Sequence, residues 1–284
     1  MEEKELHKGV IPFLNCKDHL VSEETYEIML NKHNEMLVTS PIPADLEKYY
    51  NSENYQSHNA SKKSIFNFIY NTVKKRSFKK KQSLFFNGTT NKRVLDIGAG
   101  IGDFLLYCRE TGFNVTGVEP NLRARQKAKE KGIDLHEKIE QVLDKKFDVI
   151  TMWHVLEHVP NLYECISQLK SMLSEKGKLI IAVPNFKSYD ADYYKEFWAA
   201  YDVPRHLWHF SQKSIHNLFD AVQMKVTKIQ PLKYDSFYVS LLSEKNKTGK
   251  SNFLRAFWIG LKSNLKANKT SEYSSLIYVI EHYQ

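Results

Sequence analysis

The stretch that most constrains the fold is an apolar run that leads directly into closely spaced glycines. Residues 93–97 read Arg-Val-Leu-Asp-Ile, Gly98, Gly100 and Gly102 follow at once, and apolar residues recur at helical spacing over 104–108. This order predicts a buried strand, a tight turn and the start of a helix. Glycine permits positive φ angles and lets the backbone approach a ligand closely. The stretch therefore predicts a ligand site built from backbone.

An acidic residue follows this turn at a distance typical of nucleotide-binding βαβ units. A second predicted strand, residues 114–118, ends at Glu119. An acid roughly 20 residues after such a glycine turn binds ribose hydroxyls. A ligand that contains a nucleoside is therefore expected.

Charge around the turn selects among nucleotides. Dinucleotide sites hold a pyrophosphate at the helix N-terminus, but here Asp96 precedes the first glycine by two residues and Asp103 directly follows the last. A like-charge contact at about 4 Å costs about 4 kcal/mol at an effective dielectric of about 20. S-Adenosylmethionine has a ribose, no phosphate and a net positive charge, so it is the ligand that we expect.

At these residues the chain resembles the class I S-adenosylmethionine-dependent methyltransferases. The resemblance rests on Asp96-x-Gly98-x-Gly100-x-Gly102 and on Glu119. It implies S-adenosyl-L-methionine as the cofactor. The residues that we predict to bind it are Asp96, Gly98, Ala99, Gly100, Gly102, Glu119, Pro120, Asn121, Trp153 and His154.

Strands and helices alternate along the rest of the core. Further strands are predicted at 133–136, 147–151, 178–183, 224–230 and 276–280, and helices at 122–131 and 161–173. This rhythm predicts an α/β fold with a doubly wound, mostly parallel sheet, whose ligands bind beyond the carboxyl ends of the strands. The family resemblance implies the Rossmann-like class I methyltransferase fold, with seven strands and the last one antiparallel beside the fifth.

The chain divides into three parts. Residues 1–60 form an N-terminal extension, residues 61–90 a helix and linker, and residues 91–284 the methyltransferase core, with insertions at 186–210 and 234–271. The helix of the second part is predicted over 64–81.

The extension resembles the N-terminal segment of a bacterial methyltransferase subgroup in which cysteine pairs form a zinc ribbon. Cys16 stands in the place of the first pair, but Asn31-Lys-His-Asn34 replaces the second. Tetrahedral thiolate zinc needs both pairs. We therefore expect a metal-free segment packed on the core.

Composition limits the cellular setting and the partners. No apolar run approaches the roughly 20 residues of a membrane span, and the acidic N-terminus has no apolar leader region, so a cytoplasmic protein is expected. The net charge of +8 permits anionic partners. Its two basic stretches, 74–81 and 245–269, are interpreted as solvated faces.

One of these basic stretches is also amphipathic. Leu254, Trp258, Leu261 and Leu265 fall on one helical face, with lysine and arginine around it. Such a helix can lie on a membrane surface. We favour packing of the stripe against the core or against a second subunit in a homodimer.

Histidines are the candidate catalytic groups. Methyl transfer requires alignment of the acceptor with the S–CH₃ bond, and a hydroxyl acceptor benefits from a general base. The insertion after the fifth strand holds Arg205, considered as an anion-binding residue, with His206 and His209, and His158 follows the fourth strand. We predict His158, His206 and His209 as catalytic residues.

A metal site is the alternative role for the first of these groups. In the related ubiquinone-pathway and small-RNA methyltransferases, a Glu-x-x-Glu-His element binds a divalent cation. Here His154 stands at its first position, ahead of Glu157 and His158. We therefore predict no metal, with Trp153 and His154 lining the cofactor pocket, and keep the cation site as the alternative.

The expected function is methyl transfer to a small-molecule acceptor, with oxygen the favoured atom. An RNA methyltransferase is the runner-up because of the basic stretches, but no recognisable RNA-binding module precedes the core, so nucleic acid is not an expected partner. A non-catalytic methyltransferase-like partner protein is the third interpretation. The complete set of Asp96, glycines and Glu119 argues against it.

Overall fold

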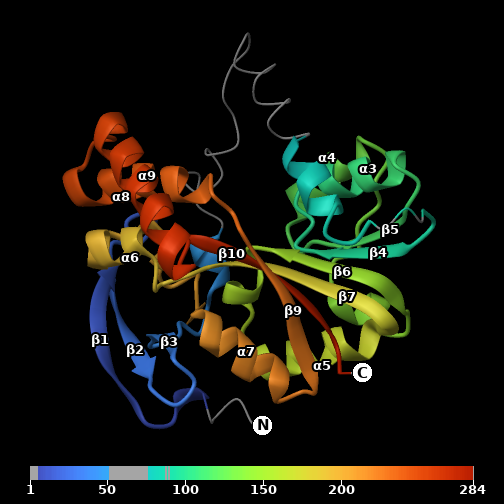
Figure 1. Cartoon of the computed structure of the whole chain (residues 1–284), viewed down its shortest axis with the longest axis horizontal. Coiled ribbons are helices and arrows are strands. Elements are labelled where there is room, and N and C mark those ends of the chain that lie inside the picture. The colour runs from blue at the N-terminus through green and yellow to red at the C-terminus, as the bar shows by residue number, and fades with distance from the viewer. Residues whose placement is uncertain (1–5, 51–75, 87, 89, 284) are drawn as a thin grey trace.

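The computed structural model describes residues 6–50, 76–86, 88 and 90–283 (Figure 1). Within this part of the chain, the main sheet has six strands in the order β5-β4-β6-β7-β10-β9. They are β4 (Arg93–Ile97), β5 (Asn114–Val118), β6 (Phe147–Trp153), β7 (Leu173–Pro184), β9 (Met224–Pro231) and β10 (Ser275–His282). β5, β4, β6 and β7 are parallel, and β10 runs antiparallel between β7 and β9. The α/β class and the antiparallel last strand are confirmed.

Helices cover both faces of this sheet. Figure 1 shows α3 (Asp103–Glu110) and α4 (Leu122–Lys129) on one face, and α5 (Leu162–Met172) and α7 (Gln212–Asp220) on the other. Strands covered on both faces are apolar along their whole length, and the last four residues of β4 are all buried. The doubly wound arrangement follows from this pattern.

The predicted third strand, at 133–136, is wrong. Only a bridge between Val118 and His136 remains at this edge. Directly after His136 the chain leaves the sheet, and the side chain of Gln141 accepts hydrogen bonds from the backbone N–H groups of Glu137 and Lys138 at 2.9 and 3.0 Å. A 3₁₀ helix, η4 (Ile139–Val142), follows. The described sheet therefore has one strand fewer than the seven expected.

The N-terminal extension is a second, antiparallel sheet that the core completes. Its strands are β1 (Val10–Lys17), β2 (Thr25–Asn31), β3 (Met36–Ser40) and β8 (Trp208–His209). A 3₁₀ helix, η2 (Glu47–Tyr49), follows β3. β8 comes from the insertion after β7. It pairs antiparallel with β3, so that His209 lies opposite Leu37. The extension therefore packs on the core, as expected, and it shares a sheet with the insertion. Of the helix predicted over 64–81, residues 76–82 are helical and 64–75 lie outside the described residues.

The insertion between β9 and β10 is a helical hairpin. It consists of α8 (Asp235–Thr248) and α9 (Phe253–Thr270). α9 buries small residues such as Ala256 and Gly260, whereas Leu254, Trp258 and Leu265 are 77%, 63% and 58% exposed. The expected packing of this stripe on the core is therefore wrong. In the described part of the chain, no helix has the length and apolar character needed to cross a bilayer.

A buried ion pair joins the extension to the insertion after β7. This insertion also contains α6 (Tyr189–Tyr194), η6 (Lys195–Phe197) and η7 (Ala199–Tyr201). The guanidinium of Arg205 donates to Asp18 at 2.9 Å and to Asp202 at 2.7 Å. Arg205 and Asp18 are each 1% exposed. Arg205, considered above as an anion-binding residue, instead neutralises two acids of its own chain.

Removing the acid of this pair should destabilise the fold far more than removing a surface charge beside it. Asp18→Ala is expected to lower the free energy of unfolding by about 3 kcal/mol, because it removes one of the two acids that neutralise a buried guanidinium and the acceptor for the N–H groups of Leu20 and Ser22. The control Lys17→Ala breaks an exposed ion pair with Glu23 and should cost less than about 1 kcal/mol. Urea denaturation measures both, and equal effects would contradict a structural role for the pair.

Candidate functional site

The glycine turn after β4 forms the floor of the site. Gly98 has a φ of 69°, and a Cβ there would overlap the side chain of Val155. Its N–H and that of Ala99 donate to the carbonyl of Val118 at 2.8 and 3.0 Å. Gly100 has a φ of 54°, and a Cβ there would meet nothing within 4 Å. The backbone is therefore locked on one side and open to a ligand at Gly100.

The carboxylate of Glu119 closes this turn from the end of β5. It accepts the N–H of Gly100 at 2.8 Å and the N–H of Asn121 at 2.9 Å. Asn121 in turn caps α4 by accepting the N–H of Ala124, and the carbonyl of Pro120 accepts from Arg125. The Glu119 carboxylate accepts the Gly100 N–H, which is the donor that a bound phosphate would use. Each Glu119 oxygen still has a lone pair that can accept a hydrogen bond from a hydroxyl.

Asp96 lies beneath the turn and is 2% exposed. Its carboxylate accepts the hydroxyl of Thr151 at 2.6 Å. Burial raises the pKa of Asp96 to about 7, against the opposing effects of this hydrogen bond and of the Lys81 charge. A cation placed beside Asp96 would therefore lower this pKa and favour the ionised carboxylate.

Lys81 is a site residue that the sequence analysis missed. Its ammonium lies 4.0 Å from the centre of the Trp153 ring. Burial lowers the pKa of Lys81, although Asp96 and Asp235 act in the opposite direction. Within a run of lysines nothing marked this one, since Lys80 beside it is at the surface and donates to the carbonyl of Pro231.

The electrostatic expectation for Asp103 needs correction. Its carboxylate forms an ion pair with Lys131 at 2.7 Å. The same ammonium donates to the carbonyl of Ile101. The negative character of the turn therefore comes from Glu119 and Asp96 rather than from Asp103.

His154 follows β6 in a left-handed conformation, with a φ of 56°. Its backbone N–H donates to the carbonyl of Ala182 at 2.9 Å. Its ring lies 3.1 Å from the carboxylate of Asp235 on α8 and 3.3 Å from that of Glu157. Burial opposes the charge, but these two acids raise the pKa of His154 to about 10. His154 is therefore a cation at neutral pH, which is unsuited to ligating metal.

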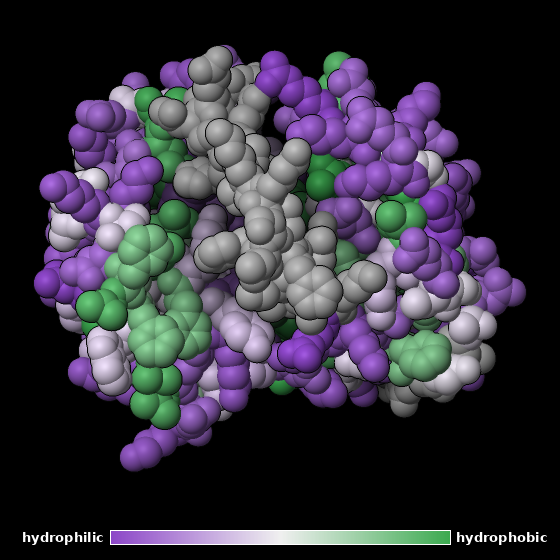
Figure 2. Space-filling model, turned by 90° about the horizontal axis from the view of Figure 1, so that it is seen from above, coloured by the Kyte–Doolittle hydropathy of each residue, from purple (hydrophilic) through white to green (hydrophobic). Residues whose placement is uncertain are grey.

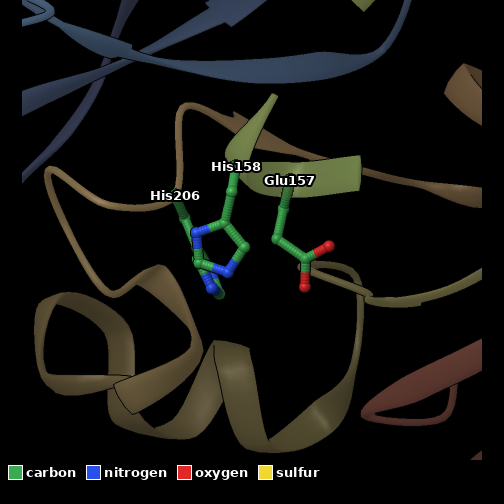
Figure 3. A group of neighbouring side chains, drawn as sticks. All are labelled: Glu157, His158 and His206. Carbon is green, nitrogen blue, oxygen red and sulfur yellow. The ribbon is translucent and has the colours of Figure 1, made fainter. Parts of the chain in front are cut away.

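Glu157, His158 and His206 form a cluster that was not predicted as a group (Figure 3). Glu157 and His158 belong to η5 (Leu156–His158), and His206 comes from the insertion after β7. Each residue offers one ligand atom, and these atoms lie within 4.8 Å of one another. The loop is held in place because the N–H of Leu207 donates to the carbonyl of Glu157 at 2.8 Å.

Both histidines of the cluster are oriented by backbone carbonyls. Nδ1 of His158 lies 3.0 Å from the carbonyl of Arg205, and Nδ1 of His206 lies 2.8 Å from that of Ala200. A carbonyl can only accept, so each Nδ1 carries a hydrogen, and in the neutral form of each ring Nε2 has a lone pair. Burial and the charge of His206 lower the pKa of His158 to about 4, so this ring is neutral at neutral pH.

Glu157 supplies the negative charge of the cluster. It is 1% exposed, and among the described residues neither carboxylate oxygen has an aligned hydrogen-bond partner, although His154 lies at ion-pair distance. Burial acts to raise its pKa, but the charges of His154 and His206 outweigh it and lower the pKa to about 2. An ionised, underpaired buried carboxylate beside two lone pairs suits a proton or a cation.

His209, the third predicted catalytic histidine, lies behind the cluster. Its ring is 6.4 Å from that of His206, and its Nε2 lies 3.0 Å from the hydroxyl of Thr39 in the N-terminal sheet. Burial, together with the charge of His206, lowers its pKa well below the ordinary value. The ring of His209 also packs edge-on against that of Tyr201, with centroids 5.3 Å apart.

A cavity of about 280 Å³ borders this region through Asp202 and Arg205. Its walls include Trp198 and Tyr201 of the insertion and Asn246 of α8. Aromatic walls with a few polar groups are typical of small-molecule sites.

Comparison with known proteins places this arrangement in context. A family model for a methyltransferase domain matches residues 68–229. A ubiquinone biosynthesis O-methyltransferase from Actinobacillus pleuropneumoniae is 34% identical over 113 residues, which cover 35% of this chain and 48% of that protein. An uncharacterized protein from Methanocaldococcus jannaschii is 33% identical over 106 residues, which cover 36% and 47%. The chain thus spans about half the length of these curated relatives.

Solved structures share the fold at low sequence identity. Magnesium protoporphyrin IX methyltransferase from Synechocystis, with bound S-adenosylhomocysteine, superposes with a TM-score of 0.54 at 13% identity, covering 83% of this chain and 97% of that one. An O-methyltransferase from a polyketide synthase of Brevibacillus brevis gives 0.52 at 13% identity, covering 76% of each chain. These similarities support the Rossmann-like assignment.

The protonation of His154 should depend on α8. Asp235→Asn removes one of its two acids, so the pKa of His154 should fall from about 10, as followed by NMR titration of the imidazole ring. Because the raised pKa stabilises the fold fully below the unfolded value of about 6.5, the variant's loss of stability should be greatest near pH 6 and shrink as the pH rises through the folded pKa. The exposed acid Asp134 serves as the control, as Asp134→Asn. An unchanged titration in Asp235→Asn would contradict the pairing.

Proposed function

This chain belongs to the methyltransferase domain family, and from that premise we propose its function. We propose that the protein binds S-adenosyl-L-methionine and transfers its methyl group to an oxygen of a small molecule. The observation that carries the proposal is the Glu119 carboxylate on the Gly100 N–H. This contact occupies the donor that a phosphate would need and leaves acceptors for ribose hydroxyls. The names of relatives that act as O-methyltransferases support the choice of oxygen.

The cofactor residues fit an adenosyl sulfonium. Glu119 would hold the ribose, Gly98, Ala99, Gly100 and Gly102 would provide the close backbone, and Pro120 and Asn121 would follow the nucleoside edge. When bound, S-adenosylmethionine supplies a methyl group already activated by its positively charged sulfur. Asp96 and Trp153 would offer a carboxylate and a ring face near that charge. The Lys81 ammonium lies over the same ring and interacts with the same carboxylate.

The acceptor hydroxyl would be activated by His158 and His206. In their neutral form, the Nε2 lone pairs of these rings would accept the proton that the acceptor hydroxyl loses. Ionised Glu157 stabilises the positive charge that such a proton brings to the cluster. The role of the insertion is thus to carry His206 to the two residues that follow β6.

A divalent cation is the second candidate for this cluster, contrary to the expectation of a metal-free site. The favouring observation is the orientation of both Nδ1–H groups toward carbonyls, which is how metal-binding histidines are held. Glu157, His158 and His206 would be the ligands, and the cation would polarise the acceptor oxygen.

We propose that the protein is cytoplasmic. We also propose that its N-terminal sheet is a metal-free counterpart of a zinc ribbon. Cys16 is buried, and burial raises its pKa, so the thiolate that zinc requires is disfavoured. Its thiol lies 3.4 Å from the carbonyl of Glu196. The segment would therefore support the insertion through packing.

Calorimetry with purified protein tests the cofactor. S-Adenosylmethionine and S-adenosylhomocysteine should bind, and Glu119→Gln should weaken both by about tenfold or more, because hydrogen bonds to a charged acceptor contribute roughly 1.5–3 kcal/mol. Glu140→Gln, an exposed acid on η4, is the control. Tight binding of NAD or ATP without binding of the methyl donor would overturn the proposal.

Methyl transfer from radiolabelled S-adenosylmethionine to a panel of hydroxylated small molecules tests the cluster. His206→Asn should lower the rate on any acceptor that is methylated by about 100-fold or more, the typical contribution of a general base, while S-adenosylhomocysteine binds as before. His216→Asn, at an exposed position on α7, is the control. An unaffected rate in His206→Asn would remove the assigned role.

Metal binding distinguishes the two forms of this cluster. If magnesium, manganese or zinc binds to the wild type by calorimetry and the site is lost in His206→Asn, the cation form holds. If none binds and the rate survives EDTA, the histidines act as bases without metal.

A further inference from the structure

The helical hairpin carries the most exposed apolar side chains of the described residues. Tyr234, Leu254, Phe253 and Trp258 are 81%, 77%, 71% and 63% exposed, and every other large apolar residue described is below 60%. Figure 2 shows a patch of apolar side chains on the side of the molecule where Figure 1 places α8 and α9. We name the residues Phe253, Leu254, Phe257, Trp258 and Leu265 of α9 the apolar strip.

α9 packs on the rest of the protein through a different set of positions, and within the strip Phe257 stacks on Phe237 of α8 with ring centroids 5.5 Å apart. The buried positions Ala256, Ile259, Gly260, Ser263 and Ala267 face α8 and α6. A Cβ at Gly260 would lie 2.9 Å from the Cα of Phe237, so the two helices are in close contact there. Clusters of exposed apolar residues of this kind mark surfaces that bind something.

Charge identifies what the strip binds. Seven residues of 235–270 are lysine or arginine and two are acidic. Of the two acids, Asp235 pairs with His154, and Glu244 is buried and accepts from Tyr194. The outer surface of the hairpin is therefore basic.

The basic residues border the strip on one side of α9. Arg255, Lys262, Lys266 and Lys269 follow one another at the spacing of a helical face, next to the apolar positions. A second copy of the chain would bring equal positive charges together across a twofold axis. Anionic lipid headgroups attract them, and aromatic side chains prefer the interface between headgroups and acyl chains.

We propose that the α8–α9 hairpin docks the protein on an anionic membrane surface, with the apolar strip inserted among the lipids and the flanking lysine and arginine on the headgroups. An apolar groove of about 610 Å³ lined by Tyr234, Phe237, Leu241, Phe253 and Phe257 offers room for an acyl chain. The docking surface adjoins the candidate site, since Asp235 at the start of α8 contacts His154. The inference does not depend on the methyl-transfer activity.

Vesicle co-sedimentation of the full chain tests the proposal. The protein should bind vesicles of phosphatidylcholine with phosphatidylglycerol, bind vesicles of phosphatidylcholine alone at least about tenfold more weakly, and lose affinity as salt rises. The double variant Leu254→Ser/Trp258→Ser should reduce partitioning by about tenfold or more, since each buried CH₂ contributes to interfacial binding. Lys262→Glu/Lys269→Glu should have a comparable effect on the anionic vesicles only.

Matched controls separate docking from misfolding. Tyr283→Ser changes an aromatic residue that is 53% exposed, the same fraction as Phe257, and that contacts Asp220 of α7 rather than the hairpin, and should leave partitioning unchanged. Circular dichroism should be unaltered in every variant because the changed side chains are exposed.

Three results would overturn the proposal. The first is wild-type binding that shows no preference for anionic vesicles. A second is binding that persists in Leu254→Ser/Trp258→Ser. The third is a lipid-free dimer, seen by light scattering and abolished by that variant, because a second copy would then cover the strip.

Discussion

The hydrogen bond between the Glu119 carboxylate and the Gly100 N–H connects the features on which the site depends. It holds the ends of two parallel strands, β4 and β5, at the distance that the glycine turn requires. It also places a negative charge where related dinucleotide folds receive a phosphate. The same contact therefore fixes the local geometry and selects a ligand without phosphate. Asp96 adds to this selection because a carboxylate favours a cation, whereas the Trp153 ring is already in contact with the Lys81 ammonium.

A second constraint assembles the acceptor side from distant parts of the chain. His206 reaches Glu157 because β8 pairs with β3 and because Arg205 is held by Asp18 of the N-terminal segment. The loop between these anchors is short, so the position of the His206 ring follows from them. The N-terminal sheet thus acts as a support for the cluster, although it contributes none of the three ligand atoms.

Local sequence signals were sufficient where a feature depends on neighbours in the chain. The strand, glycine turn and helix around Gly98 are such a feature, and so is the position of Glu119 at the end of β5. The edge strand was wrong because the predicted segment forms only a single bridge, Val118 to His136, and the next two N–H groups donate to the side chain of Gln141. Lys81 was missed because only the tertiary fold separates it from the lysines beside it.

The remaining errors concern partners that no local pattern encodes. His158 and His206 were both predicted as catalytic residues, but the position of His206 beside Glu157 depends on the pairing of β8 with β3 in the N-terminal sheet. The amphipathic pattern of α9 was also recognised, and the side of the helix that packs was misjudged. A signal was present there, since Ala256, Gly260, Ser263 and Ala267 are small residues that let helices approach closely, and they mark the packed face better than large apolar residues do.

The distribution of charge carries information that the net charge of +8 conceals. The hairpin holds seven basic and two acidic residues over 235–270, whereas the floor of the site is edged by Asp96 and Glu119. A cation is favoured at the centre and an anionic surface at the hairpin, and averaging the two gives only a moderately basic protein.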